Sequence, residues 1–347
     1  MGKARPSLRL GRRLRFKGTP GAFEDVSAVA FCGEHLLLAA DEATPDPAGH
    51  DEDALHNRVE IYAPRRRHRK HSRYKRIADI ALPLPEGEEL DIEALAVDPD
   101  TRTVFVAGSH SAKRRRVKAD KSAADNRARL SVDGIVAEPF RRGLFRFRLT
   151  EDLTGVDGTI DRLDLWSALE GSDVLAPFLA LPSKENGVDL EGLALGPDGW
   201  LWVGFRGPVL RGNWVPVMRF DPRSGEHALR FVTLGGRGIR AIARITDGFL
   251  LVAGPVGDQD WDHRLYYWDG GCLLPGDRTD DATPGRLVEL AAIDTPPDGR
   301  PEGLAVRRED RNGSTHCARL VIAYDGVTRL DHVARRARLV WSNPADG

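Results

Sequence analysis

Five copies of a two-part pattern constrain this chain more than any other feature of its sequence. The first part has a polar third residue followed by small and aliphatic residues, and it recurs at residues 25–30, 91–96, 189–194, 238–243 and 300–305. A turn and a second apolar segment follow each copy, at residues 36–42, 104–110, 201–207, 250–256 and 320–326. A diverged pattern repeated five times predicts a fold built from repeated units.

The repeated segments favour β-strands. Each second segment starts with three mostly branched or aromatic residues and continues with a small one, as in Val104-Phe-Val-Ala107. The segments have strand length, are bounded by turns and are rich in Val, Leu, Trp and Phe. This composition excludes a stacked helical solenoid.

The shortest repeat can be interpreted strand by strand. From Glu191 onward, the pattern predicts a first strand, then strands at 201–207, 215–220 and 227–234, with turns at 198–199 and 223–225. Four antiparallel strands in ~50 residues make one blade of a propeller. We therefore predict an all-β, five-bladed β-propeller that forms a single domain over residues 1–347, with a six-bladed propeller as the alternative.

The other blades follow the same scheme. Further strands are expected at 58–62, 74–82, 143–149, 160–165, 263–268, 286–290 and 337–341. The last blade is short and lacks one strand. Residues 7–10 and 13–16 alternate polar and apolar side chains, so we expect the N-terminus to supply that strand and remove a free sheet edge.

A basic insertion, residues 110–142, lengthens blade two. It is dominated by Lys, Arg, Ala, Ser and Asp and has no long apolar period. It should therefore form a loop or a short helix over the ligand face near His110, without adding a blade. The insertion has no interleaved aromatic residues for base stacking, which favours a solvated loop over a nucleic-acid site.

The charge and the cysteine content argue against a nucleic-acid-binding, membrane-spanning, zinc-binding or disulfide-rich protein. The chain has 51 Lys and Arg against 52 Asp and Glu, a net charge of −1, so it lacks a global field that would attract nucleic acid or a membrane. No apolar run approaches the ~20 residues of a membrane span. The 3 cysteines show no CxxC spacing, which favours neither a zinc site nor a disulfide framework. These features predict a cytoplasmic protein with reduced thiols and leave its oligomeric state open.

Several motifs resemble those of the bacterial DUF3616 family. They are DIEALA at 91–96, GSHSAKRR at 108–115, EGLA at 191–194, FRGPVLRG at 205–212 and PEGLA at 301–305. The resemblance runs from about residue 26 to 325 and implies a propeller fold. That family is uncharacterised, so the resemblance implies no reaction. The EGLA element is also similar to motifs of phytase-like propellers and of gluconolactonase-like calcium proteins, and fold analogy alone does not license a function.

The third residues of the five repeats are the candidate site. In a propeller the first strand of each blade lines the channel, so Ser27, Glu93, Glu191, Arg240 and Glu302 should gather at one end of it. Three converging carboxylates repel one another. A cation shared by Glu93, Glu191 and Glu302, with Ca²⁺ as the candidate cofactor, would offset that repulsion. Alternatively, Arg240 neutralises one of them, or they cap neighbouring backbone through water with no ligand.

The tips of the second strands surround the same channel mouth. They place Asp41, His110, Arg206 and Asp325 beside Arg240 as candidate ligand-binding residues for a small molecule or an anion. Arg206 and Arg240 suit a phosphate or carboxylate, or else pair with Glu191 and Glu302. Adjacent strand residues point to opposite faces, so we expect His110 to position a ligand and not to activate a neighbouring serine.

These features predict a propeller of unassigned activity with a ligand-binding or cation-binding site at the channel mouth. One alternative is a metal-dependent hydrolase of a small phosphate ester or lactone. The other is a non-catalytic scaffold that holds a partner on the same face. The pattern identifies no catalytic residue, and it leaves open whether the protein is an enzyme.

Overall fold

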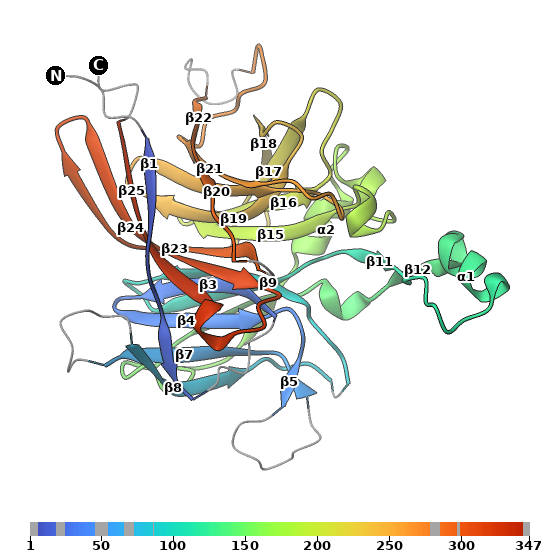
Figure 1. Cartoon of the computed structure of the whole chain (residues 1–347), viewed down its shortest axis with the longest axis horizontal. Coiled ribbons are helices and arrows are strands. Elements are labelled where there is room, and N and C mark those ends of the chain that lie inside the picture. The colour runs from blue at the N-terminus through green and yellow to red at the C-terminus, as the bar shows by residue number, and fades with distance from the viewer. Residues whose placement is uncertain are drawn as a thin grey trace.

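Five sheets form the blades of the protein (Figure 1). The computed structural model describes residues 6–18, 25–45, 55–65, 73–85, 87–277, 285–296 and 299–342. The strands of blades one to three are β3 Val26–Cys32, β4 His35–Ala40, β7 Arg58–Pro64, β8 Arg73–Ala81, β9 Ile92–Asp98, β10 Thr103–Gly108, β13 Leu144–Arg148, β14 Asp161–Leu163, β15 Asp189–Leu195, β16 Leu201–Gly207, β17 Trp214–Phe220 and β18 His227–Thr233.

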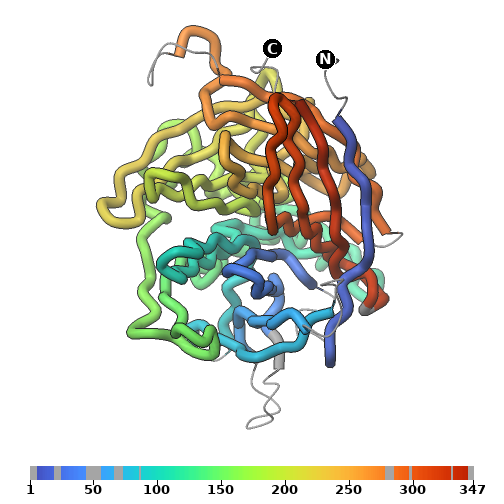
Figure 2. Tube along the Cα trace, turned by 90° about the vertical axis from the view of Figure 1, so that its left-hand side faces the viewer, coloured from blue at the N-terminus to red at the C-terminus, as the bar shows by residue number. Residues whose placement is uncertain are grey.

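The remaining blades complete a ring. Their strands are β19 Gly238–Ile245, β20 Gly248–Gly254, β21 His263–Trp268, β22 Leu287–Ile293, β23 Arg300–Asn312, β24 Thr315–Asp325, β25 Ala334–Ser342 and β1 Ser7–Arg13. The innermost strands contact one another in the order β3, β9, β15, β19, β23 and back to β3. The tube in Figure 2 follows the same chain path from the side. The prediction of a five-bladed β-propeller is confirmed.

The N-terminal segment joins two blades. β1 pairs antiparallel with β25 and completes blade five, as the sequence predicts. The expectation for residues 13–16 is wrong, because β2 (Arg15–Lys17) pairs in parallel with β8 of blade one. Between the two strands Leu14 is fully buried, and its amide donates to the carbonyl of Ala334 at 2.8 Å. The chain turns from one blade to the next at this leucine, so the closure links blades five and one.

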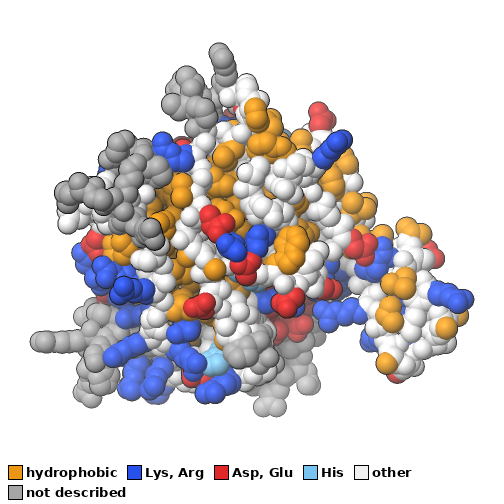
Figure 3. All heavy atoms as spheres, turned by 45° about the horizontal axis from the view of Figure 1, so that its top comes forward, with side chains coloured by type: hydrophobic (Ala, Val, Ile, Leu, Met, Phe, Trp, Pro, Cys, Tyr) orange, Lys and Arg blue, Asp and Glu red, His pale blue; other side chains and the backbone are white. Residues whose placement is uncertain are grey.

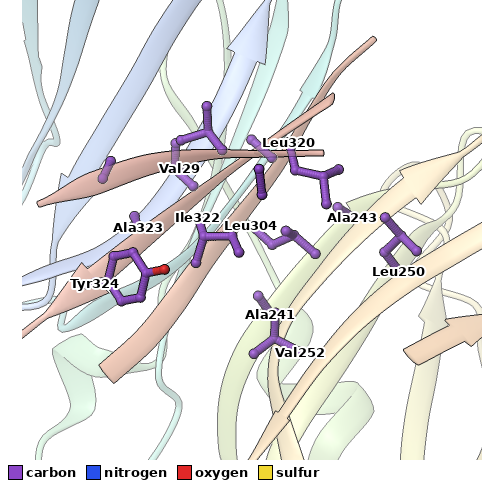
Figure 4. Packing of buried hydrophobic residues seen from close by; sticks show 14 of the residues in the cluster. Val29, Ala241, Ala243, Leu250, Val252, Leu304, Leu320, Ile322, Ala323 and Tyr324 are labelled. Atoms are coloured by element: carbon purple, nitrogen blue, oxygen red, sulfur yellow. The ribbon is translucent and has the colours of Figure 1, made fainter. Parts of the chain in front are cut away.

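The core lies between neighbouring blades. Second strands such as β4 and β10 are buried at every residue after the first, because adjacent blades cover both of their faces. One cluster runs through blades one, four and five, and includes Val29, Val252 and Leu304 (Figure 4). The continuous apolar runs of these strands therefore reflect burial on two sides.

Close packing between blades explains the glycine of the EGLA element. A Cβ on Gly303 would lie 2.7 Å from Cγ1 of Val29 in blade one. A Cβ on Gly192 would lie 2.9 Å from Cγ2 of Ile242 in blade four. Both distances are shorter than carbon–carbon contact allows, so a larger residue at either position would push two blades apart.

The basic insertion forms an arm that points away from the blades (Figure 1). Its base is a ribbon of β11 (Ala112–Arg114) and β12 (Ile135–Ala137), which the sequence did not predict. Its tip is α1 (Ala123–Leu130), capped by the hydroxyl of Ser122, which accepts from the amide of Asp125. No residue of α1 is buried, so the expectation that the insertion covers the ligand face is wrong. No blade is added.

Hydrophobic side chains are exposed on this arm together with basic ones (Figure 3). Val117, Leu130 and Val132 are 53%, 62% and 76% exposed. The arm has too few apolar contacts to form a core of its own.

The other short elements lie in the loops between the strands of the blades. They are β5 Thr44–Pro45, β6 Leu55–His56, α2 Leu165–Glu170 and the 3-10 turns η1 Val132–Gly134, η2 Pro139–Arg141, η3 Ala176–Phe178, η4 Ser183–Glu185 and η5 Leu330–His332. The strand expected at 160–165 is shorter than predicted, because the Asp164 carboxylate accepts from the Ser167 amide and starts α2. None of the described helices is long and apolar enough to cross a membrane.

Candidate functional site

The third residue of every repeat is the extra residue of a β-bulge. Between β3 and β4, Val26 pairs with Ala40 and Ala28 with Ala39, so the register passes over Ser27. The other inner strands skip the equivalent residue, which is Glu93, Glu191, Arg240 or Glu302. A bulge bends its strand and re-aims the side chain of the extra residue. These five side chains therefore contact neighbouring blades.

Arg240 of blade four joins the carboxylates of two neighbouring blades. Its Nη1 donates to Oε1 of Glu191 at 2.9 Å, and its Nη2 pairs with Glu302 of blade five. All three residues are buried, with 4%, 3% and 8% of their surface exposed. Buried charges of this kind must be paired, and here the pairing ties three blades together.

Arg206 provides a second buried cation. Its Nη1 lies 2.8 Å from Oε1 of Glu191, and its Nη2 pairs with Asp189. Burial would lower the pKa of Arg206, but the charges of Asp189 and Glu191 outweigh burial and raise it. Burial raises the pKa of Asp189 to about 6 even though Arg206 opposes the shift. The guanidinium groups of Arg206 and Arg240 thus face carboxylates of their own chain.

A different group of carboxylates lies next to this network. Oxygens of Asp41, Asp91 and Glu93 all lie within 4.8 Å of one another. Arg141 from η2 pairs with Asp91 and, at 2.9 Å, with Glu89. Among the described residues, neither Asp41 nor Glu93 takes part in an ion pair.

The electrostatics of this group are unfavourable for negative charge. Burial, and then the charges of Asp91 and Asp325, raise the pKa of Asp41 to about 8. Burial and the neighbouring charges of Asp91 and Glu191 raise the pKa of Glu93 well above its ordinary value. In the absence of a cation, burial and like charge therefore favour the protonated forms of both carboxyl groups.

The predicted ligand-binding residues occupy two different places. Asp41, Arg206, Arg240 and Asp325 surround the channel mouth. Asp325 ends β24, and burial raises its pKa while the charge of Arg240 lowers it. His110 lies apart, where its ring stacks on Trp166 of α2 with a centroid separation of 6.5 Å.

The environment of His110 is apolar and cationic. Burial, together with the charges of Arg162 and Arg142, lowers the pKa of its ring to about 4. Its Nδ1 lies 2.8 Å from the carbonyl of Gly108, so Nδ1 carries the proton of the neutral ring. The hydroxyls of Ser109 and Ser111 lie 2.9 Å apart and bond to each other. The geometry therefore pairs no serine with this histidine in the described part of the chain.

Three members of the site were not among the predicted ligand residues. Asp91 and Asp189 lie two positions before Glu93 and Glu191, and the period of a strand places them on the same face. That period places both residues on the channel side from the sequence alone, although neither was a candidate ligand. Arg141 comes from the end of the basic insertion, and nothing in its local sequence distinguishes it from the other arginines there.

Comparison with solved structures yields distant likenesses. Exo-β-1,3-galactanase from Phanerochaete chrysosporium is 7% identical, with a TM-score of 0.38 over 96% of this chain and 64% of that chain. Hydrazine synthase from Kuenenia stuttgartiensis is 12% identical, with a TM-score of 0.38 over 95% of this chain and 65% of that one. A hypothetical protein from Leishmania major is 12% identical, with a TM-score of 0.37 over 98% and 92%. TM-scores this low support no inference about activity.

Sequence comparison assigns the family. No curated protein matches the chain. Residues 25–337 match the family described as "Protein of unknown function (DUF3616)", and this span contains all five repeats of the propeller. The chain therefore belongs to the DUF3616 family.

Proposed function

We propose that the channel mouth of this propeller binds a divalent cation through Asp41, Asp91 and Glu93, and that Ca²⁺ is the ion that suits it best. The proposal rests on the three carboxylate oxygens that lie within 4.8 Å of one another. Oxygen ligands of Ca²⁺ lie ~2.3–2.6 Å from the ion, so two ligands on opposite sides are ~5 Å apart. Ca²⁺ also accepts several carboxylates in irregular geometry, whereas Mg²⁺ retains water.

The charges around the three residues support a cation over an anion. Asp25 and Asp325 lie close enough for their charges to raise the pKa of Asp41 further. The buried guanidinium groups nearby already face Asp91, Asp189, Glu191 and Glu302. A divalent cation would offset the charge of Asp41 and Glu93, which these arginines leave unpaired.

This ligand set differs from the set that the repeat predicts. Glu93 belongs to both, but Glu191 and Glu302 share Arg240 as their counter-ion. Two carboxylates of the predicted set are thus ion-paired, and Glu191 has Arg206 as a second partner. In the set of Asp41, Asp91 and Glu93, only Asp91 is ion-paired among the described residues, with Arg141. A metal at the predicted set would therefore have to displace more buried charge pairs. We therefore assign Asp41 and Asp91 in place of Glu191 and Glu302. The proposal covers binding only, and the hydrolase alternative stays a prediction.

Calcium is expected to stabilise the protein through Glu93. At a Ca²⁺ concentration 100 times its Kd, the free energy of unfolding should rise by about 2.7 kcal/mol, and chelator should reverse the gain. Glu93→Gln should abolish the response and leave the metal-free protein at least as stable, because a neutral amide of the same shape replaces a carboxyl group whose charged form is unfavourable there. Thermal melts and calorimetric titration with Ca²⁺ and Mg²⁺ measure both effects.

Glu302→Gln is the matched control. It removes a carboxylate at the equivalent repeat position but leaves the proposed ligands intact. We expect it to lower stability, since Arg240 loses a partner, and to leave the Ca²⁺ response unchanged. Loss of the response in Glu302→Gln would favour the set predicted from the repeat. A wild-type protein that ignores Ca²⁺ and Mg²⁺ would refute cation binding.

The stability of the metal-free protein should fall as the pH rises toward 8. The pKa of Asp41 is about 8 in the folded protein, raised from 3.8. Between pH 3.8 and about 8 the folded state keeps a proton on Asp41 that the unfolded state has released. The stability that this proton contributes is therefore complete at acid pH and is lost as the pH rises through about 8. Because Ca²⁺ would replace that proton, its stabilising effect should be larger at pH 8 than at pH 6. Equal Ca²⁺-induced shifts in melting temperature at the two pH values would contradict this.

A further inference from the structure

Four arginines lie side by side across the sheet of blade five. In the register of the sheet, Arg9 lies opposite Arg338, Arg338 opposite Arg319, and Arg319 opposite Arg308. The row thus crosses β1, β25, β24 and β23, which lie next to one another in Figures 1 and 2. All four side chains are exposed. Like charges directly opposite one another destabilise a sheet, so folding alone does not account for this row.

The arginine row borders a groove of about 970 Å³ at the end of β23 remote from the channel mouth. Seven arginines line it and no lysine does: Arg9, Arg12, Arg307, Arg311, Arg319, Arg336 and Arg338. Asp310 is the one acidic residue among the described residues of this lining. Between the guanidinium groups the exposed aliphatic lining includes Val340, which is partly exposed, whereas Leu320 and Val321 are buried beneath it. We call this feature the arginine groove.

Few carboxylates of the protein neutralise the arginine groove. Arg307 reaches Glu34 at 3.6 Å, and Arg311 reaches Asp247 at 3.1 Å. Asp310 is itself engaged by Arg308 at 2.6 Å.

The central arginines of the groove face one another. Within the described ranges, Arg9, Arg12 and Arg319 form no ion pair. Burial, and then the charges of Arg307, Arg12 and Arg319, lower the pKa of Arg336, which shows how closely the cations are crowded. The groove therefore presents several guanidinium groups to an external anion.

The dimensions and lining of the groove select among polyanions. Neighbouring strands are ~4.8 Å apart, so the arginine row spans ~14 Å, the length of about four extended residues. Among the described residues no aromatic side chain lines the groove, so these residues offer bases nothing to stack on. The chain as a whole carries a net charge of −1, and a long nucleic acid would extend beyond the positive area. A second copy of the same face would repel the first.

We propose that the arginine groove binds a short acidic segment of a partner protein. Its carboxylates would be held by the planar guanidinium forks of the row, which bind carboxylates in bidentate fashion. Aliphatic side chains between the acidic residues would pack on Val340 and on the methylene stems of the arginines. This site is independent of the cation site, because it lies at the other end of blade five.

Fluorescence anisotropy with a labelled peptide tests the proposal on the full-length protein. The probe is a fluorescein-labelled hexapeptide of alternating glutamate and leucine, and the reference is the same peptide with glutamine in place of glutamate. We expect the acidic peptide alone to bind, with an affinity that falls as salt is raised. Arg319→Gln with Arg338→Gln should weaken binding by about tenfold or more. The lysine double variant, Arg319→Lys with Arg338→Lys, should retain part of the affinity.

Two controls distinguish a direct loss of peptide binding from a loss of folding and from a change in the overall charge of the protein. The glutamine double variant should melt at or above the wild-type temperature, because it removes opposed like charges. Arg115→Gln with Arg116→Gln removes the same charge from exposed residues of the arm and should leave peptide binding unchanged. Absence of peptide binding at ~50 mM salt, or equal losses in both double variants, would overturn the proposal. Tighter, groove-dependent binding of a labelled 20-nucleotide single strand would also overturn it.

Discussion

Deletion of residues 1–17 is expected to lower the free energy of unfolding by several kcal/mol, a large part of the ~5–15 kcal/mol that holds a typical domain together. The deletion removes β1 from blade five and β2 from blade one, so it exposes one edge on each of two sheets. It also removes Leu14, which is fully buried, and the ring of Phe16, which packs edge-on against Tyr62 at 5.0 Å.

Urea denaturation of the truncated and full-length proteins measures this effect. Deletion of residues 1–5 is the control, because it leaves both strands in place. Leu14→Ala in the full-length chain should by itself cost about 2–5 kcal/mol, since it leaves a cavity where the segment crosses between blades. The closure would be unimportant to stability if the 1–17 deletion unfolded at the same urea concentration as the intact chain.

Replacement of Arg240 by alanine is expected to cost about 3–5 kcal/mol. Arg240 is the counter-ion of Glu302 and one of two for Glu191, and all three are buried. Its loss would leave the Glu302 carboxylate buried without an opposite charge. This loss of stability should be smaller at acid pH, where protonation of the Glu302 carboxylate removes the uncompensated charge.

Arg264→Ala is the control for the loss of an arginine in the same blade. Arg264 contacts Asp262 at 2.7 Å and pairs with Glu289, but its side chain is 33% exposed. Its removal should cost no more than ~1 kcal/mol, because water replaces the lost contacts. Chemical denaturation of both variants at pH 5 and pH 8 tests the comparison. If the two variants lost similar amounts of unfolding free energy, the buried ion pairs of Arg240 would not be more important than exposed ones.

The repeats made most of the fold predictable from the sequence. Strands of blade three were expected at 215–220 and 227–234, and they form at Trp214–Phe220 and His227–Thr233. This success has a local cause, because strand-length apolar runs and turn residues encode each blade within its own ~50 residues.

The predictions from the sequence were wrong where the partner of a strand lies far away in the chain. Residues 7–10 and 13–16 each alternate polar and apolar side chains, and this alternation fits the edge of either blade. Tertiary geometry decided that β1 joins blade five while β2 joins blade one. The insertion had a predictable helix, but its direction depends on the β11–β12 ribbon, whose three-residue strands are too short to recognise in a sequence.

The sequence by itself indicated that the third residues of the five repeats would gather at one end of the channel, since equivalent positions of a repeat occupy equivalent places in a ring. It also placed His110 there, but this histidine instead stacks on Trp166. It did not determine which of these charges would pair. The bulges at Glu93, Glu191 and Glu302 re-aim each carboxylate by an amount that depends on the adjoining strands. Only the tertiary structure placed Arg240 between Glu191 and Glu302 and left Glu93 beside Asp41 and Asp91, because charge pairing depends on separations of a few ångströms between blades.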